Sequence, residues 1–527
     1  MADRARLLAA ALALAGAGCA RCSGSSAGAG SAGAIPTDPD LTVQIAGETV
    51  KVRRGASLPA TSAVFDGEVV RLRAARGETL GLQVLLRGAG ERAVSLSLDA
   101  PDVAVQPFEV GYLEVTEPSS GLYGPSTGPG AYPDILRPAG GPVRSADAVF
   151  FDLAVARGAA PGLRRGTLAI GRDRLPVELR VEPVAIDIER APLVWVWFKA
   201  AELAGRHGMA DGDSAEQIAL ERTYMALFRR HGALLATDFP LDRLRAREDL
   251  MTDDVRYWPV WIAKRDPARM AADVAAWVEY FRDRPQIPYG FTIDEPDEEE
   301  RAQVRAHGLA IRAAGGGDPR FLYAVTDQPR DLYRGAVDVF VSPRGIPAPD
   351  GHGPGVRFWT YNGRAPSAGN MTIDKPGVAL RTWGWIAERY GVELWFAWEG
   401  LYYTDRYNRP AGPTDVMHQP LTYDERRKGG EERGNGDGLL AYPGPLPSLR
   451  LKALRRGLQD RLLLRHLAGC GADGAAEAAA IARRLVPRAL GEALEGAPSW
   501  PLDEPAWERA RHDVLDAIAR RCPEEDP

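Results

Sequence analysis

The sequence has few of the residues that bind metals or cross-link chains. It contains 4 cysteines and 7 histidines in 527 residues, and none of them stand at the spacings of a zinc site. Positive charge is not in excess either, because the net charge is -6. A nucleic-acid-binding surface needs a basic footprint. We therefore predict a protein with no metal centre, no cofactor and no nucleic-acid partner.

No apolar run near the start is long enough to cross a membrane. Residues 7–17 are apolar and follow two arginines, which is the pattern of an export signal. Small residues then lead to Cys19, as in a bacterial lipoprotein signal, although Gly16 stands where leucine is usual. We predict that residues 1–34 are a signal peptide and flexible tether, with Cys19 lipidated and ordinary cleavage as the alternative. The protein is then exported to a bacterial cell envelope and contacts the membrane only through this anchor.

Two cysteines remain outside the signal region, Cys470 and Cys522. In an exported protein they could form a disulfide or stay as two buried thiols, and both alternatives remain open. The chain length predicts two or three domains. An apolar content of 45% is ample for large cores.

Short alternating runs occupy the first third of the folded chain. Apolar and polar residues alternate with period two between residues 41 and 186, and glycine, proline and aspartate separate the runs. Strands at this spacing predict a β-sandwich in residues 35–190. Residues 117–141 read as one long polar loop, which we expect to fold over the neighbouring domain.

From residue 192 the pattern changes to strands that alternate with helices, which predicts a (β/α)8 TIM-like barrel in residues 191–446. Helices after Thr326 and Val341 are weak, so we expect an irregular barrel. The expected strands are residues 193–198, 233–236, 258–262, 289–293, 321–325, 337–341, 357–361 and 393–398. The expected helices are residues 214–230, 267–284, 297–314 and 378–390.

Residues 447–527 are predicted to form a C-terminal helical cap on the barrel. Three segments, residues 447–467, 475–486 and 504–521, are rich in helix-favouring alanine, leucine and arginine. The fold class is therefore multidomain, with a β-sandwich, a TIM-like barrel and a helical segment.

Two adjacent carboxylates, Asp294 and Glu295, end the predicted strand at residues 289–293. Pro296 stops strand pairing, and Asp297 and Glu300 have the spacing of a capping box for the next helix. Helix capping is then already supplied, so Asp294 and Glu295 are free for acid chemistry at the carboxyl end of a barrel strand. The plainer interpretation is that both are solvated residues before a helix.

Aromatic and polar residues end two other predicted strands. Rings at a barrel mouth can stack on a sugar, and amides can bind its hydroxyls. Core packing is the alternative, and it fits Trp359 better than its neighbours. The predicted substrate-binding residues are Trp359, Tyr361, Asn362, Trp398, Glu399 and Tyr402.

Several stretches together resemble one family. They are Asp294-Glu295-Pro296, Trp359-Thr-Tyr-Asn-Gly363 with Asp374-Lys-Pro-Gly377, Gly436-Asp-Gly-Leu-Leu-Ala-Tyr-Pro-Gly444 with Ser448-Leu-Arg-Leu451, Ala75-Arg-Gly-Glu-Thr79 and Tyr132-Pro-Asp134. Their order and spacing resemble glycoside hydrolase family 123 and the related domain of unknown function 4091. The resemblance spans roughly residues 41–467.

This resemblance implies hydrolysis of terminal β-linked N-acetylgalactosamine, with retention and assistance by the substrate's acetamido group. It implies Glu295 as general acid/base and Asp294 as the residue that orients the acetamide. A different mechanism pairs Glu295 with Glu399 as nucleophile, as in ordinary retaining glycosidases. A non-catalytic glycan-binding lipoprotein is the second hypothesis. In each case the expected partner is a glycan.

Overall fold

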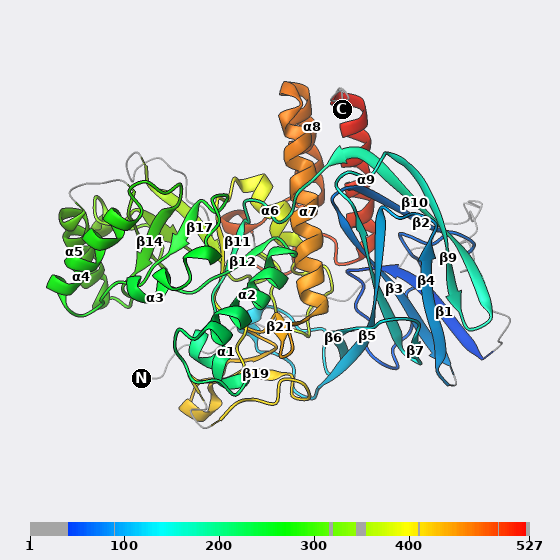
Figure 1. The fold of residues 1–527 in the computed structure, drawn as a ribbon, viewed down its shortest axis with the longest axis horizontal. Coiled ribbons are helices and arrows are strands. Elements are labelled where there is room, and N and C mark those ends of the chain that lie inside the picture. The colour runs from blue at the N-terminus through cyan, green and yellow to red at the C-terminus, as the bar shows by residue number, and fades with distance from the viewer. Residues whose placement is uncertain are drawn as a thin grey trace, which may run out of the picture.

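The computed structural model describes residues 40–88, 90–315, 320–343, 355–408, 412–493 and 495–522. Its N-terminal strands lie on one side, the barrel-like domain on the other, and helices α7 (Leu449–Gly469) and α9 (Glu504–Arg521) between them (Figure 1). The predicted signal peptide, tether and lipidated Cys19 lie outside the described residues. None of the described helices combines the length and hydropathy that a membrane span requires.

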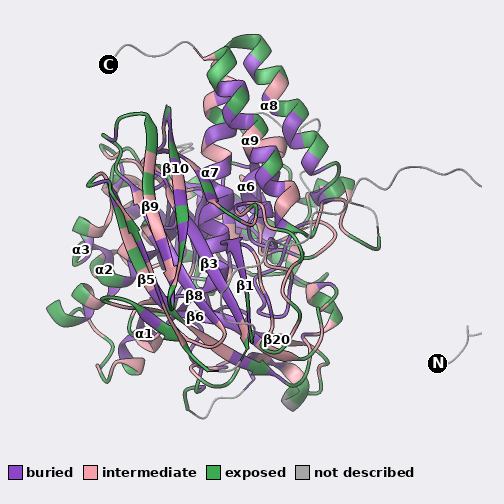
Figure 2. Cartoon of the chain, turned by 90° about the vertical axis from the view of Figure 1, so that its right-hand side faces the viewer, coloured by how far each residue is buried: buried purple, intermediate pink, exposed green. Residues whose placement is uncertain are grey.

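Two five-stranded sheets form the N-terminal domain, in the orders β1-β3-β8-β5-β6 and β2-β10-β9-β4-β7. Inward residues of both sheets, such as Leu82 and Leu179, share one apolar core, and the buried strand interiors are visible in Figure 2. The predicted sandwich is thus built of period-two strands with one buried face. Its strands are β1 (Leu41–Gly47), β2 (Val70–Arg76), β3 (Thr79–Gly88), β4 (Arg92–Leu98), β5 (Val103–Val115), β6 (Gly130–Pro138), β7 (Val143–Ser145), β8 (Ala148–Val155), β9 (Gly162–Ile170) and β10 (Asp173–Ala185).

The prediction of one long loop at residues 117–141 is wrong in its second half. Residues 130–138 form β6, which pairs antiparallel with β5 at the edge of its sheet. Pro133 and Pro138 concealed the strand, because prolines are tolerated in a sheet at an edge strand. The first half, residues 117–129, does reach the neighbouring domain, where Ser119 bonds Asp374.

Eight parallel strands form the second domain, and all eight overlap the predicted ones. Most are short and wholly buried, as expected for strands covered on both faces. They are β11 (Val194–Val196), β12 (Ala233–Leu235), β13 (Tyr257–Pro259), β14 (Ile287–Phe291), β15 (Leu322–Val325), β16 (Val339–Val341), β17 (Arg357–Tyr361) and β18 (Trp395–Ala397).

The sheet order is β12-β11-β18-β17-β16-β15-β14-β13, which is the neighbour order of a (β/α)8 barrel opened between β12 and β13. Within the described residues, no strand ladder joins these two edges, and a single parallel bridge links Phe239 to Val260 beyond their ends. The domain is therefore a curled, TIM-like sheet rather than a barrel closed by continuous pairing.

The helices of this domain differ in length, and not every pair of consecutive strands is connected by an α-helix. The predicted capping box exists, because the amide N–H of Asp297 donates to Glu300 and that of Glu300 to Asp297. Between β15 and β16 there is only one 3-10 turn, η3 (Asp331–Tyr333), as the weak pattern after Thr326 indicated. The helices are α1 (Ala200–Arg206), α2 (Ala215–Arg229), α3 (Leu241–Arg245), α4 (Pro267–Tyr280), α5 (Glu300–Ala314) and α6 (Thr382–Tyr390), of which α1 and α3 were not predicted.

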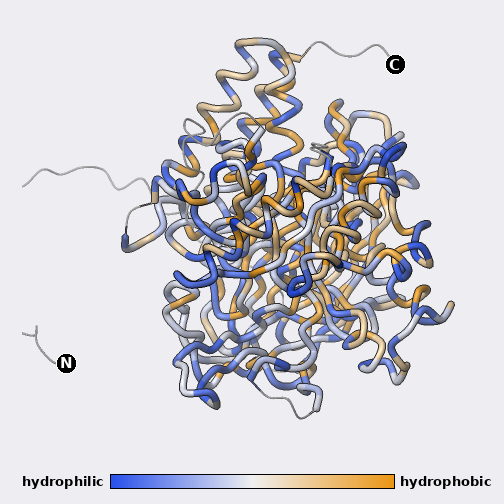
Figure 3. The backbone as a smooth tube through the Cα atoms, turned by 90° about the vertical axis from the view of Figure 1, so that its left-hand side faces the viewer, coloured by the Kyte–Doolittle hydropathy of each residue, from blue (hydrophilic) through white to orange (hydrophobic). Residues whose placement is uncertain are grey.

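Two small antiparallel sheets of two strands each precede the C-terminal helices. The first pairs β19 (Leu421–Asp424) with β20 (Arg433–Asn435), and the second pairs β21 (Ala441–Tyr442) with β22 (Leu446–Pro447). Helix α7 is buried on nearly all sides because both domains cover it. Helices α8 (Gly471–Leu485) and α9 instead alternate between hydrophobic and hydrophilic residues (Figure 3).

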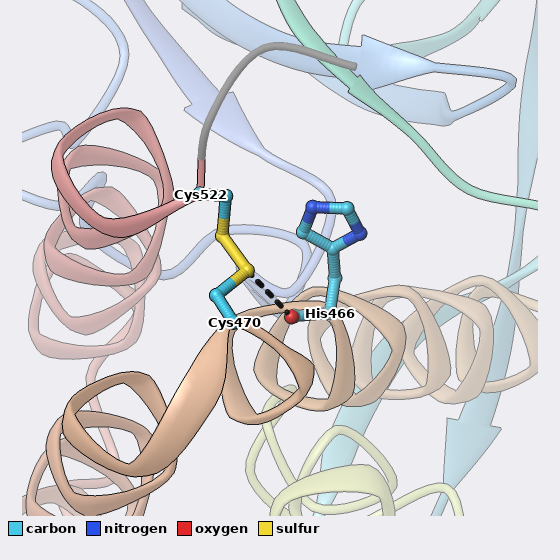
Figure 4. Close-up of side chains that lie close together, drawn as sticks. All are labelled: His466, Cys470 and Cys522. Atoms are coloured by element: carbon cyan, nitrogen blue, oxygen red, sulfur yellow. Dashed lines mark hydrogen bonds between the residues drawn. A yellow bond between two sulfur atoms is a disulfide. The ribbon is translucent and has the colours of Figure 1, made fainter.

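A disulfide joins Cys470 and Cys522 and links the end of α7 to the end of α9 (Figure 4). This settles the alternative left open by the sequence. His466 lies beside the pair, and the three potential ligand atoms are within 4.8 Å of one another. Sulfur atoms in a disulfide are not thiolates, so this cluster does not offer a metal the ligands it would need.

Buried ion pairs join the three parts of the chain. Glu78 of the sandwich lies 2.9 Å from Arg456 of α7 and 2.5 Å from Arg511 of α9. Arg511 and Arg381 of the barrel domain both contact Asp460. Because a charge left alone in such a site is strongly destabilising, these contacts fix how the domains sit against each other.

Candidate active site

A cavity of about 1190 Å³ opens at the carboxyl ends of the parallel strands. Its floor is aromatic, with the rings of Trp195, Phe291 and Phe396 stacked in the barrel interior. Functional sites of barrel folds are placed at this end of the strands. Of the predicted site residues, Asp294, Glu295, Tyr361, Asn362 and Trp398 all line it.

Asp294 and Glu295 follow β14 and are both exposed to the cavity. Thr326, just after β15, connects them: its hydroxyl donates to Asp294 Oδ1 at 2.6 Å and accepts from the Glu295 amide at 2.6 Å. Glu295 has φ +46°, so the chain turns in the left-handed region at this residue. That turn brings two consecutive side chains to one cavity, where an extended strand would send them to opposite faces.

Three residues that line the cavity have an unfavourable, left-handed backbone conformation. Non-glycine residues with positive φ are rare, and Glu295, Asn362 and Leu490, with φ of 46°, 50° and 46°, all line the cavity. Such conformations cost free energy and persist where the surroundings enforce them, often at functional sites.

Tyr361 lies across from the acid pair. Its hydroxyl donates to Glu295 Oε1 at 2.5 Å, which joins the ends of β17 and β14. Burial and the Glu295 carboxylate raise the pKa of Tyr361, so the phenol remains a donor near neutral pH. This bond engages one oxygen of Glu295.

Trp398 forms another wall of the cavity, and two side chains hold it. The amide oxygen of Asn362 accepts from the Trp398 backbone N–H at 3.0 Å, and the indole Nε1 donates to Asp437 at 3.2 Å. Asp437 is buried, which raises its pKa, and it also accepts from the hydroxyl of Tyr123. Tyr123 belongs to the 117–129 loop, so the N-terminal domain contributes to this site.

The same region contains Asp238, which follows β12. Trp197 Nε1 donates to its carboxylate at 2.8 Å, and desolvation raises the pKa of Asp238. Lys264, after β13, also lines the cavity. The cavity lining therefore contains a further carboxyl group and an ammonium group besides Asp294 and Glu295.

Most stretches that carry the family resemblance do not line the cavity but form buried contacts next to residues that do. Asp134 and Arg450 form a buried ion pair at 2.8 Å, and Arg450 Nη1 donates to the Gly436 carbonyl beside Asp437. Asp374, fully buried, accepts from Ser119 Oγ and Ser126 Oγ of the 117–129 loop. These residues join the domains and position Asp437 and Tyr123.

Three of the predicted substrate-binding residues, Trp359, Glu399 and Tyr402, do not line the cavity. Trp359 is buried in the barrel interior against Tyr257 and Tyr289. Glu399 is fully buried and bonds Arg406 at 2.5 Å, and burial raises its pKa to about 7. Tyr402 is also buried, and its ring lies behind Trp398.

The predicted site residues did not include Thr326, Asp238, Tyr123 or Asp437. Thr326 and Asp238 follow predicted strands at their carboxyl ends, so the strand-end rule could have found them. Tyr123 comes from another domain, and no local pattern marks it.

No family model and no curated relative match the sequence. Among solved structures the fold is similar to a family 123 glycoside hydrolase from Clostridium perfringens, described for glycolipid glycan hydrolysis. The TM-score is 0.64 at 11% identity, over 91% of this chain and 98% of that one. A GH2 β-galacturonidase from Eisenbergiella tayi overlaps loosely, with a TM-score of 0.27 at 11% identity over 61% of this chain and 62% of that one. The first likeness establishes the fold: a sheet-rich N-terminal domain on a TIM-like domain, as in a family 123 glycoside hydrolase.

Proposed function

We propose that the protein is a glycoside hydrolase that removes terminal β-linked N-acetylgalactosamine, or a related N-acetylhexosamine, from a glycan. The observation that carries this proposal is the shared exposure of Asp294 and Glu295 in one aromatic-lined cavity. Two carboxyl groups and a ring-lined pocket are what hydrolysis of a glycosidic bond requires. The similar fold of the Clostridium perfringens enzyme supports it.

In the proposed reaction Glu295 donates a proton to the leaving oxygen while the substrate's acetamido oxygen attacks the anomeric carbon. The C–O bond to the leaving group breaks, and an oxazolinium intermediate forms. Asp294 stays ionised and accepts from the acetamido N–H. Water, deprotonated by Glu295, then opens the intermediate and restores the acetamide with retained configuration.

The hydrogen bonds of the site suit these roles. Tyr361 engages Glu295 Oε1, which leaves Oε2 to carry the proton. Thr326 holds Asp294 Oδ1, which leaves Oδ2 for the acetamide. Because Thr326 also bonds the Glu295 amide, the two carboxyl groups keep a fixed relation without help from substrate.

The decisive experiment compares Glu295→Gln with a neighbouring control, Glu299→Gln, on an aryl N-acetyl-β-galactosaminide. Glu299 is exposed and precedes α5. We expect Glu295→Gln to lose nearly all turnover with an unchanged circular dichroism spectrum, and the control to keep it. Equal turnover in both variants would reject the proposal. The aryl β-galactoside, which has no acetamido group, should be hydrolysed far more slowly if substrate assistance operates.

The alternative with Glu399 as nucleophile is less favoured. A nucleophile must reach the anomeric carbon, whereas Glu399 has no exposed surface and its carboxylate bonds Arg406. Loss of turnover in Glu399→Gln with a trapped glycosyl-enzyme would support that alternative. Sugar binding without turnover in the unmodified protein would instead support a glycan-binding role.

We also propose that the protein is exported and lipid-anchored through Cys19. The Cys470–Cys522 disulfide supports an oxidising compartment. Fractionation of cells that express the full chain tests this. Wild type should enter the membrane fraction, and Cys19→Ala should release it.

A further inference from the structure

A second cavity, of about 550 Å³, lies at the opposite end of the parallel strands. Its apolar lining includes Val194 of β11, Leu234 of β12 and Leu394, which precedes β18, and α7 contributes Arg461 and Arg465. Trp195 lines both this cavity and the candidate active site. Pockets of this volume are large enough for a small ligand.

Arg461 is a buried cation whose hydrogen bonds are incomplete. Its side chain is 11% exposed, and its Nε lies 3.6 Å from Glu388 Oε2, beyond hydrogen-bonding distance. Among the described residues, this buried Nε has no hydrogen-bond partner. An unsatisfied buried donor of a charged group is costly, so an additional partner is expected in the cavity.

Arg465 adds a second positive charge one helical turn further along α7. Like charges at positions i and i+4 of a helix repel each other. Burial, followed by this neighbour, lowers the pKa of Arg461 to about 10 despite the attraction of Glu388. The pair therefore lacks a sufficient counter-charge.

Two other carboxylates that line the cavity, Asp254 and Glu393, are paired with arginines outside the lining. Asp254 bonds Arg229 at 2.6 Å. Glu393 bonds Arg357 at 2.9 Å and accepts from the Tyr257 hydroxyl. Arg256 lies over the Tyr257 ring at 5.2 Å and adds further positive charge. Within the described part of the chain, Glu388 is the carboxylate that remains to face Arg461.

We propose that this lower cavity binds a small oxyanion, a carboxylate, phosphate or sulfate group, between Arg461 and Arg465. The planar guanidinium offers paired N–H donors that match such oxygens. Bound there, the anion would satisfy Arg461 Nε and relieve the repulsion along α7. The apolar lining would accommodate a small carbon skeleton attached to the anion. This inference does not depend on the proposed glycosidase activity.

The test measures thermal unfolding and isothermal titration of the full chain in potassium phosphate, potassium sulfate and potassium acetate. Each is compared with potassium chloride at equal ionic strength. Binding to the native state raises the midpoint as ligand concentration exceeds the dissociation constant. We expect one of the three oxyanions to raise the unfolding midpoint more than chloride does. The oxyanion with the largest effect identifies the chemical group that the cavity binds.

Arg465→Gln should weaken this binding at least tenfold. Arg465 is exposed, so the variant should fold. The matched control is Arg483→Gln, an exposed arginine of α8 outside the cavity, which should bind like wild type. The proposal is overturned if no oxyanion acts differently from chloride. It is equally overturned if Arg465→Gln and the double variant with Arg461→Gln bind as wild type does.

Discussion

The hydroxyl of Tyr361 donates to Oε1 of Glu295 across the mouth of the cavity. The two residues are 66 positions apart, and the curl of the sheet brings the ends of their strands together. Because the phenol donates to Oε1, that oxygen is occupied as an acceptor and Oε2 is the one left to carry the proton. The hydrogen bond also limits rotation of a side chain that must meet the leaving oxygen in one geometry.

Replacing this donor should slow the proposed reaction without unfolding the protein. Tyr361→Phe removes a hydrogen bond to a charged group, worth about 1.5–3 kcal/mol, so kcat/KM should fall about 10- to 100-fold. Steady-state kinetics on the aryl N-acetyl-β-galactosaminide measure this. Tyr280→Phe is the matched control, because it removes a Tyr–Glu bond, to Glu248, outside the cavity. Equal kinetics in both variants would argue against a role for Tyr361.

Thr326 should act as a positioning residue. Thr326→Val keeps the shape but removes the hydroxyl that holds Asp294 and the Glu295 amide. We expect kcat to fall about tenfold or more with a smaller change in KM, because the loss disturbs alignment rather than binding. Thr326→Ser restores the hydroxyl and should recover most of the rate. If serine fails to rescue, the effect of valine comes from packing and not from the hydrogen bonds.

The eight parallel strands were predictable because strands buried on both faces are short apolar runs. Strand β6 was not, since its prolines conceal an edge strand, and α1 and α3 are too short to show a clear period. The closure of the sheet also escaped prediction. Whether β12 and β13 pair depends on how the connecting segments pack, which no local pattern records.

At the site, the rule that chemistry follows strand ends found Asp294, Glu295, Tyr361, Asn362 and Trp398. It failed for Glu399, because the chain turns inward after Trp398 and buries that carboxylate against Arg406. The motifs behind the family resemblance were harder to interpret. Asp134 and Arg450 lie 316 residues apart and form an ion pair between domains. The residues adjacent to each of them in the sequence do not indicate whether the role is structural or catalytic.

Glu399 should give the protein a distinctive pH dependence. Burial raises its pKa from 4.5 to about 7, so the native state binds its proton more tightly than the unfolded chain does. This contribution to stability is fully present below pH 4.5 and is lost as pH rises through 7, by up to about 3 kcal/mol. Urea unfolding at pH 5 and pH 7 should show this loss in wild type relative to Glu399→Gln. Parallel pH profiles would contradict the assignment.

The Cys470–Cys522 disulfide should stabilise the C-terminal helices. It closes a segment with a sequence separation of 52, for which loop-closure entropy gives about 4 kcal/mol. Reduction, or the pair Cys470→Ser and Cys522→Ser, should lower the unfolding midpoint and expose residues 470–521 to amide exchange first. Hydrogen-exchange mass spectrometry measures this region by region. Unchanged protection there would show that packing on α7 is sufficient.

The carboxylate of Glu504, in the last helix, accepts from the amides of Gly47 and Thr49 at the end of the first strand, each at 2.9 Å. This contact has a consequence for biosynthesis. During translation the first strand is made hundreds of residues before its partner leaves the ribosome. Chains interrupted before residue 504 would leave those amides uncapped and the ion pairs of Arg511 unmade. The contacts between the sandwich and α9 can therefore form only after the chain has been synthesised through Arg511.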